Sequence, residues 1–273
     1  MTIGFSPCPN DTFIFDALVH ERIDLEGMHF EPVLADVEEL NRMASKGKLD
    51  VTKLSYHAFG HLSNSYKLLH SGSALGRGVG PLLVSTKVMS EEDVADASIA
   101  IPGAWTTANF LMGLAYPKAT NKSEVLFSDI ENLVLSGQFD AGLLIHENRF
   151  TYEQRGLIKL ADLGEYWEKS SGRPIPLGGI AVKRDRPAEV QKKIDRLVKK
   201  SLEYAYQNPE AALPYVQAHA QAMDLEVMQA HIDLYVNEYS LDLGDEGREA
   251  VQHLLSKGRE LQLIPDGPSD LFV

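Results

Sequence analysis

The chain has 273 residues, 44% of them hydrophobic and 24% charged, a composition typical of a globular protein with room for two separate cores. Its formal net charge of −13 argues against binding to nucleic acid or to an anionic membrane, because both repel an acidic protein. A single cysteine excludes an internal disulfide, and no apolar run reaches the roughly 18 residues of a membrane-spanning helix. With no signal-peptide pattern at the N-terminus, we expect a cytoplasmic protein.

The first part of the chain alternates short apolar runs with helical patterns. Asp36 and Glu39 are spaced as a capping pair at the start of the second helix. The segment from Gly47 to Val51 combines a helix-ending glycine with the start of a strand. In chain order we predict a strand at 2–5, a loop at 6–10, a helix from 11, a strand at 28–33, a helix to 45 and a strand at 51–55.

The same order of elements recurs further along the chain. Ser128 and Glu131 again have the spacing of a capping pair, and the segment from Gly137 to Ala141 repeats the glycine and aspartate pattern of the first copy. These matches favour a structural duplication over chance. We predict a strand at 98–101, a loop at 102–106, a helix at 107–114, a strand at 124–127, a helix, and a strand at 143–145 that leads to His146.

Alternation of strands and helices predicts an α/β protein with two lobes, each a mixed, mainly parallel sheet flanked by helices. We assign residues 1–86 and 180–273 to a larger, discontinuous lobe and residues 87–179 to a smaller one. The chain is expected to cross between the lobes at 76–86 and at 173–183, where prolines and glycines suit a hinge.

From residue 187 onward the pattern is helical, and these helices are expected to cover the first lobe. Asn208, Asp224 and Asp245 are the candidate helix starts. A lysine-rich stretch on the first of these helices is interpreted as a solvated face; its members are Lys192, Lys193, Lys199 and Lys200.

Ligands of open α/β sheets bind beyond the carboxyl ends of the strands, and candidate functional residues occupy such positions here. His146 follows an apolar strand and precedes a polar stretch. Because histidine titrates near neutral pH, it could act as a general base there, or it could be a rim histidine bonded to the backbone.

The other candidates each have a functional and a structural interpretation. Thr106, Thr107 and Asn109 begin a helix, where N–H groups can bind a carboxylate, or they act as ordinary caps. Ser55 either binds substrate or caps the next helix. The same ambiguity applies to Asn10 and Asp11, and to Lys53, which either binds an anion or pairs with a surface acid.

Cys8 lies between two prolines with no activating base nearby in the sequence, so a packed thiol is the preferred interpretation. His57 and His61 lack the accompanying acid of a zinc site, and the glycines at 76, 78 and 80 do not have dinucleotide-binding spacing. We therefore predict neither a metal nor a cofactor.

Six stretches taken together resemble the 1,4-dihydroxy-6-naphthoate synthases of the futalosine route to menaquinone. The first and the fourth are the most specific of them. The matching segments are SPCPNDTF at 6–13, DVTKLS at 50–55, GPLLV at 80–84, IHENRFTY at 145–152, DLG at 162–164 and GRPIPLG at 172–178.

This resemblance implies a periplasmic-binding-protein-like (type II) fold with the ligand cleft between the two lobes. It also implies a carbon–carbon lyase that converts cyclic dehypoxanthine futalosine, a small carboxylated molecule, to 1,4-dihydroxy-6-naphthoate and dihydroxyacetone. In the family, a histidine at the position of His146 is the proposed base. Ser55, Thr107 and Ala108 match positions expected to line the pocket, Ala108 through its backbone N–H.

The resemblance leaves some points open. Arg77, Arg149 and Lys53 are the candidates for neutralising the substrate carboxylate. The alternatives are chorismate dehydratase of the same pathway, a non-catalytic solute-binding protein, and a ligand-sensing domain. The sequence predicts no oligomeric state.

Overall fold

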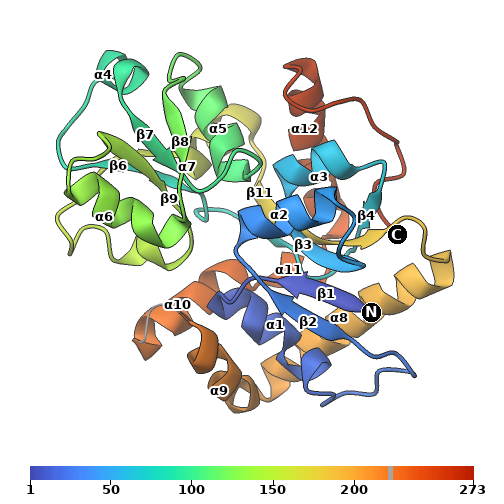
Figure 1. Cartoon of the computed structure of the whole chain (residues 1–273). Helices are drawn as coiled ribbons and strands as arrows, with labels where there is room; N and C mark the ends of the chain where they lie inside the picture. The colour runs from blue at the N-terminus through green and yellow to red at the C-terminus, as the bar shows by residue number, and fades with distance from the viewer. Residues whose placement is uncertain (221–223) are drawn as a thin grey trace. The chain divides into compact units, whose positions relative to one another are not determined.

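The structure is a computed structural model that describes residues 1–220 and 224–273 (Figure 1). The chain divides into two compact units, one made of Met1–Gly76 with Pro176–Val273 and the other of Arg77–Ile175. The boundaries differ from the expected ones at 86 and 180, because the strand at Leu82–Ser85 is hydrogen-bonded into the sheet of the second unit.

The first unit contains a six-stranded sheet and most of the helices. Its strands are β1 (Thr2–Phe5), β2 (Glu31–Leu34), β3 (Val51–Ser55), β4 (Tyr66–Leu68), β5 (Ala74–Gly76) and β11 (Ile175–Lys183), which enters from the other unit. Its helices are α1 (Pro9–Val19), α2 (Val37–Ser45), α3 (Tyr56–Leu62), α8 (Ala188–Gln207), α9 (Pro209–His219), α10 (Leu225–Tyr235), α11 (Glu238–Leu241) and α12 (Gly244–Glu260).

The strands of this sheet run in the order β2-β1-β3-β11-β4, with β5 paired to β11. β1 is parallel to β2 and β3, whereas β11 is antiparallel to both β3 and β4. Figure 1 shows α1 and α8 on one side of the sheet and α2 and α3 on the other. Helices thus cover both faces.

Residue alternation along β1 explains this packing. Ile3 and Phe5 are fully buried and face a core formed with α1 and α8. Gly4 points to the opposite face, where a Cβ atom would lie 2.7 Å from Leu49 Cδ1. The absence of a side chain there lets the segment before β3 pack closely against the strand.

The second unit contains a five-stranded sheet in the order β10-β6-β9-β7-β8. β7 is parallel to β8 and β9, and β6 is antiparallel to β9 and β10. Its elements are β6 (Leu82–Ser85), α4 (Glu91–Asp96), β7 (Ile99–Ile101), α5 (Thr107–Ala115), β8 (Lys122–Glu124), η1 (Phe127–Asp129), α6 (Ile130–Leu135), β9 (Ala141–Leu144), η2 (His146–Phe150), β10 (Ile158–Asp162) and α7 (Leu163–Ser171).

The predicted duplication is confirmed by the strand order, because β2-β1-β3 corresponds to β8-β7-β9 with the same parallel pairings. Side chains repeat as well. Asp50 accepts hydrogen bonds from Thr2 N and Thr2 Oγ1, while its own N–H donates to Thr2 Oγ1. Asp140 and Ser98 form the same three hydrogen bonds: Asp140 accepts from Ser98 N and Oγ, and its N–H donates to Ser98 Oγ. The repeated aspartate therefore ties the start of one strand to the start of its neighbour.

The mixed character of both sheets is also confirmed, but antiparallel pairings are more frequent than predicted. The reason is that a strand from outside the three-strand repeat pairs with its third strand in each sheet: β11 with β3 in the first unit and β6 with β9 in the second. Periodicity along the chain carries no information about which strand becomes the neighbour.

Of five predicted helix starts, three have the predicted residue at the N-cap and two do not. Asp36 accepts from Glu38 N and Glu39 N, and Asp224 caps α10 in the same way. Ser128 does not cap α6, because burial of Phe127 draws this segment into the short 3-10 helix η1. Asp245 lies in the first turn of α12, whose N-cap is Leu243. Asn208 takes the predicted N-cap position of α9 without a side-chain cap.

Part of the lysine-rich face of α8 contacts Glu26, whereas Lys199 pairs with Asp242. The Glu26 carboxylate accepts hydrogen bonds from the Arg196 guanidinium and, at 2.9 Å, from Lys200 Nζ. These bonds, that of Arg196 first, lower the pKa of Glu26 from 4.5 to about 2. A carboxyl group with a lowered folded-state pKa stabilises the fold above its unfolded pKa and loses that contribution as the pH falls through the folded pKa.

We therefore expect Glu26→Gln to lower the melting temperature at neutral pH. The difference from the wild-type protein should shrink as the pH falls from 4.5 towards 2. Thermal unfolding followed by circular dichroism at a series of pH values measures this. A difference that stays constant down to about pH 2 would contradict the assignment.

Candidate active site

His146 follows β9 and has a backbone φ of 57°, in the left-handed region. A residue with a side chain pays a free-energy cost of about 1 kcal/mol or more in this region, so surrounding contacts must hold it there. The imidazole is half-buried and packs on Phe127, with ring centroids 5.0 Å apart. The prediction that a strand leads to this histidine is confirmed, with Ile145 intervening as the N-cap of η2.

Arg149 fastens the same short helix to its unit. Its guanidinium donates to the Gly80 carbonyl and lies 3.5 Å from Asp162 Oδ2. The other oxygen of Asp162 caps α7 by accepting from Gly164 N at 2.8 Å. Gly80 and Gly164 are in backbone contact, since a Cβ atom on Gly80 would lie 2.2 Å from Gly164 N. These partners account for Arg149 as an anchor, and its contact with substrate stays a prediction.

The start of α5 is a tightly bonded loop. Thr106 Oγ1 accepts from Asn109 N at 3.2 Å and donates to Gly103 O at 2.8 Å, which makes it a helix cap. The Asn109 side chain bonds to Ala104 O and to Lys122 Nζ. The structural interpretation therefore accounts for Thr106 and Asn109.

Thr107 and Ala108 form the first turn of α5, and both are buried, with exposed fractions of 3% and 4%. Because Thr106 caps the N–H of Asn109, the N–H of Ala108 is not used by the cap. This is the donor through which the family resemblance expects Ala108 to act.

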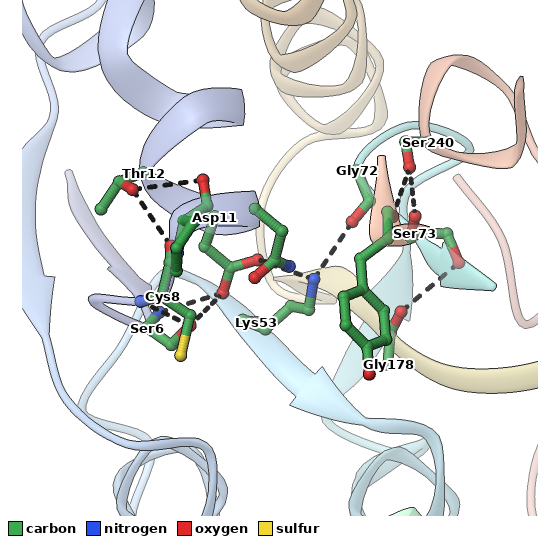
Figure 2. Close-up of polar contacts among 12 residues, drawn as sticks. Ser6, Cys8, Asp11, Thr12, Lys53, Gly72, Ser73, Gly178 and Ser240 are labelled. Carbon is green, nitrogen blue, oxygen red and sulfur yellow. Dashed lines mark hydrogen bonds and ion pairs between the residues drawn. The ribbon is translucent and has the colours of Figure 1, made fainter. Parts of the chain in front are cut away.

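In the first unit, Asp11 and Lys53 form a buried ion pair (Figure 2). Lys53 Nζ lies 2.9 Å from Asp11 Oδ1, and the two side chains have exposed fractions of 7% and 1%. The other carboxylate oxygen of Asp11 accepts from Ser6 N and Ser6 Oγ, and Asn10 Nδ2 donates to Oδ1. The structure shows Lys53 paired with an acid, but the expectation of a surface acid is wrong, because Asp11 is buried.

His231 connects the C-terminal helices to this network. His231 of α10 is fully buried, and its Nε2 lies 2.9 Å from Asn10 Oδ1. Lys53 Nζ also approaches the carbonyl of Gly72 at 3.4 Å, as Figure 2 shows. Four separate parts of the first unit thus meet around the start of α1.

Ser55 ends β3 at the N-cap position of α3, but its side chain does not cap that helix. Its hydroxyl and N–H instead bond to Asn41 of α2. The capping interpretation of Ser55 is therefore wrong.

Candidate residues occupy equivalent places in the two units. Asn10 and Asp11 lie in the first turn of α1 after β1, as Thr107 and Ala108 do in α5 after β7. Ser55 ends the third strand of one repeat, and His146 follows the third strand of the other.

Sequence reasoning missed two partners that the structure reveals, Asn41 and His231. Each lies on the buried face of an amphipathic helix, Asn41 next to Leu40 and His231 one turn after Met228. A polar side chain among apolar positions is a signal that could have found them, because a buried polar group needs a hydrogen-bonding partner.

Among residues 1–220 and 224–273, no group of three or more His, Cys, Asp or Glu side chains is placed to hold a metal ion. None of the helices in the described part of the chain has the length and hydropathy that a membrane crossing requires. Cys8 is buried at the N-cap of α1, where its carbonyl accepts from Thr12 N at 3.0 Å.

Comparison with solved structures shows the fold. A protein of Archaeoglobus fulgidus is 33% identical with a TM-score of 0.91, covering 96% of this chain and 98% of its own. The alkanesulfonate-binding protein of Xanthomonas axonopodis pv. citri, bound to MOPS, is 11% identical with a TM-score of 0.72, covering 97% and 94%. A ligand-binding component of an ABC-type import system from Staphylococcus aureus has a TM-score of 0.71 at 12% identity, covering 100% and 96%. The fold is that of periplasmic binding proteins.

Comparison of sequences shows the family. The 1,4-dihydroxy-6-naphthoate synthase of Thermus thermophilus is 46% identical over 273 residues, which are 100% of this chain and 99% of that protein. The protein of the same name from Streptomyces coelicolor is 42% identical over 277 aligned positions, covering 99% and 97%. A family model described as menaquinone biosynthesis matches residues 1–260. The chain therefore belongs to the menaquinone biosynthesis family.

Proposed function

We propose that the chain is a cytoplasmic 1,4-dihydroxy-6-naphthoate synthase, a carbon–carbon lyase that converts cyclic dehypoxanthine futalosine to 1,4-dihydroxy-6-naphthoate and dihydroxyacetone. The observation that carries the proposal is full-length identity of 46% and 42% to two proteins of that name. The solute-binding proteins of similar fold are only 11–12% identical to this chain, so their similarity supports the fold and not a shared function.

His146 is the base of the proposed reaction. Non-glycine residues at positive φ recur at functional sites. The conformation is unfavourable by itself and persists only where surrounding contacts stabilise it. The anchors of Arg149 and the Phe127 ring supply such surroundings. Neutral imidazole accepts a proton from the carbon next to the substrate carbonyl, and the enolate that results breaks the carbon–carbon bond to the sugar fragment. The imidazolium returns the proton to the departing fragment, and aromatisation of the ring drives the reaction.

Neutral donors hold the substrate carboxylate in this proposal. Lys53 already contacts the carboxylate of Asp11, and Arg149 that of Asp162. Each ion pair therefore has little net positive charge with which to attract the substrate carboxylate. Arg77, the third cationic candidate, contacts the Gly172 carbonyl at 3.5 Å and stays a prediction. In this proposal the N–H of Ala108 binds the carboxylate, because backbone N–H groups in the first turn of a helix favour anions. Donors of this kind also stabilise a developing enolate.

The test is incubation of the purified chain with cyclic dehypoxanthine futalosine, followed by absorbance of the naphthoate product and detection of dihydroxyacetone. We expect equal amounts of the two products. Binding of the substrate without conversion would support a solute-binding protein, and dehydration of chorismate would support the other enzyme of the pathway. Either result would overturn the proposal.

A further inference from the structure

One buried side chain, that of Asn41, holds Ser55 from two sides. Asn41 Oδ1 accepts from Ser55 N at 3.1 Å, and Asn41 Nδ2 donates to Ser55 Oγ at 3.3 Å. Both residues are buried, with exposed fractions of 0% for Asn41 and 3% for Ser55. The amide of α2 therefore sets the position of the residue that ends β3.

A third contact sets the orientation of the Asn41 amide. Its Nδ2 also donates to Glu38 Oε2 at 3.2 Å, so that the two amide hydrogens are shared between Glu38 and Ser55. Turning the amide over would place its oxygen against the Glu38 carboxylate and its NH₂ against the Ser55 N–H. Because both contacts would be repulsive, only one orientation is stable.

This orientation assigns a direction to the Ser55 hydroxyl. A hydroxyl has one hydrogen to donate and two acceptor positions, and Asn41 occupies an acceptor position. The hydrogen is not used in this pairing. Nor does the oxygen cap α3, in contrast to Thr106, which stands at the same kind of position and caps α5.

We propose that Asn41 is a positioning residue that makes Ser55 a hydrogen-bond donor to an acceptor oxygen of the substrate. The substrate group at Ser55 is then a carboxylate or carbonyl oxygen, and a hydroxyl or amino hydrogen is disfavoured there. Burial strengthens the selection, because a buried hydroxyl hydrogen without an acceptor costs free energy. This inference deepens the proposed function and rests on it.

The test is Asn41→Asp, which keeps an oxygen to accept from Ser55 N but replaces the donor NH₂ with a second acceptor oxygen. Because that oxygen would face the Glu38 carboxylate, Asn41→Asp and the variants compared with it are made in a Glu38→Gln background. The Ser55 hydroxyl then donates inward to the new carboxylate and turns its lone pairs towards the substrate oxygen. We expect KM to rise roughly 10- to 100-fold, with a smaller effect on kcat, as for loss of a hydrogen bond to a charged acceptor.

A double-mutant cycle with Ser55→Ala separates this role from a purely structural one. If Asn41 acts through Ser55, adding Asn41→Asp to Ser55→Ala changes KM little. If the two KM effects multiply, or if Asn41→Asp alone leaves KM unchanged, the proposal is overturned. Should Asn41→Asp not fold, Asn41→Ser is used in the same cycle with the same two criteria, since it removes both bonds without adding a charge.

Asn237→Asp is the matched control. Asn237 likewise accepts from a backbone N–H, that of Tyr239, and donates to a carbonyl, that of Leu75, but it has no contact with Ser55. We expect it to lower thermal stability and leave KM unchanged. Wild-type protein that fails to convert the substrate would refute the proposed function, whereas active wild-type protein with normal KM in the Asn41 variants would refute this inference alone.

Discussion

Replacing His146 with asparagine is expected to lower kcat by about 10²- to 10⁴-fold, because one positioned general base contributes that much to a rate. Asparagine suits the test for two reasons. It is polar and smaller than imidazole, and it tolerates the left-handed backbone conformation that His146 adopts at a φ of 57°. The variant should therefore keep the fold and the affinity for substrate, with only proton removal lost.

Two further variants serve as controls, one for the backbone conformation of His146 and one for the loss of a histidine elsewhere. His146→Gly relieves the positive φ but removes the contact of the imidazole with Phe127, and its kcat should be as low as that of His146→Asn. His219→Asn changes a histidine at the end of α9, in the other unit, and should leave kcat unchanged. Measured steady-state kinetics and substrate affinity decide the question. A folded His146→Asn protein with near-normal kcat would exclude His146 as the base.

Breaking the buried pair of Asp11 and Lys53 is expected to have the largest effect on stability. Removing one partner of a buried ion pair costs about 3–5 kcal/mol, since the remaining charge is left in a region of low polarity. Asp11→Asn should be the more harmful change, because its single amide oxygen can replace only one of the two carboxylate oxygens, which accept from Lys53 Nζ and from Ser6, and because the charge opposite Lys53 is lost. Lys53→Met leaves the carboxylate with donors from Ser6 and Asn10.

Chemical denaturation of the two single variants and of the double variant measures these effects. The double variant should recover part of the loss, because neither charge then remains unpaired. Glu165→Gln is the exposed control. It breaks the pair between Glu165 and Lys169, whose side chains are 55% and 78% exposed, and should lower stability far less than Asp11→Asn does. An Asp11→Asn effect no larger than that of this control would contradict a structural role for the pair.

The same variants test the alternative interpretation of Lys53. If Lys53 neutralised the substrate carboxylate, Lys53→Met would raise KM in protein that is still folded. We expect lowered stability with little change in KM, since the ammonium is already paired with Asp11 at 2.9 Å.

Much of the local structure could be predicted from the sequence. The strands at 2–5 and 51–55 and the helix that Asp36 begins are where the patterns place them. The repeated order of elements correctly predicted a structural duplication. These features depend on residues close together in the chain, where side-chain period, capping and glycine placement act directly on the backbone.

Only the tertiary structure decided which polar residues meet. Asp11 and Lys53 are 42 positions apart, and Asn10 and His231 are 221 apart, so no local pattern links them. The same limit applies to Ser55 and Thr106, which look alike in sequence as helix starts. Thr106 caps its helix and Ser55 does not, because α2 presents the Asn41 amide to Ser55. Hydrogen-bond partners of buried groups are chosen by strand order and helix packing, and these arise from the fold as a whole.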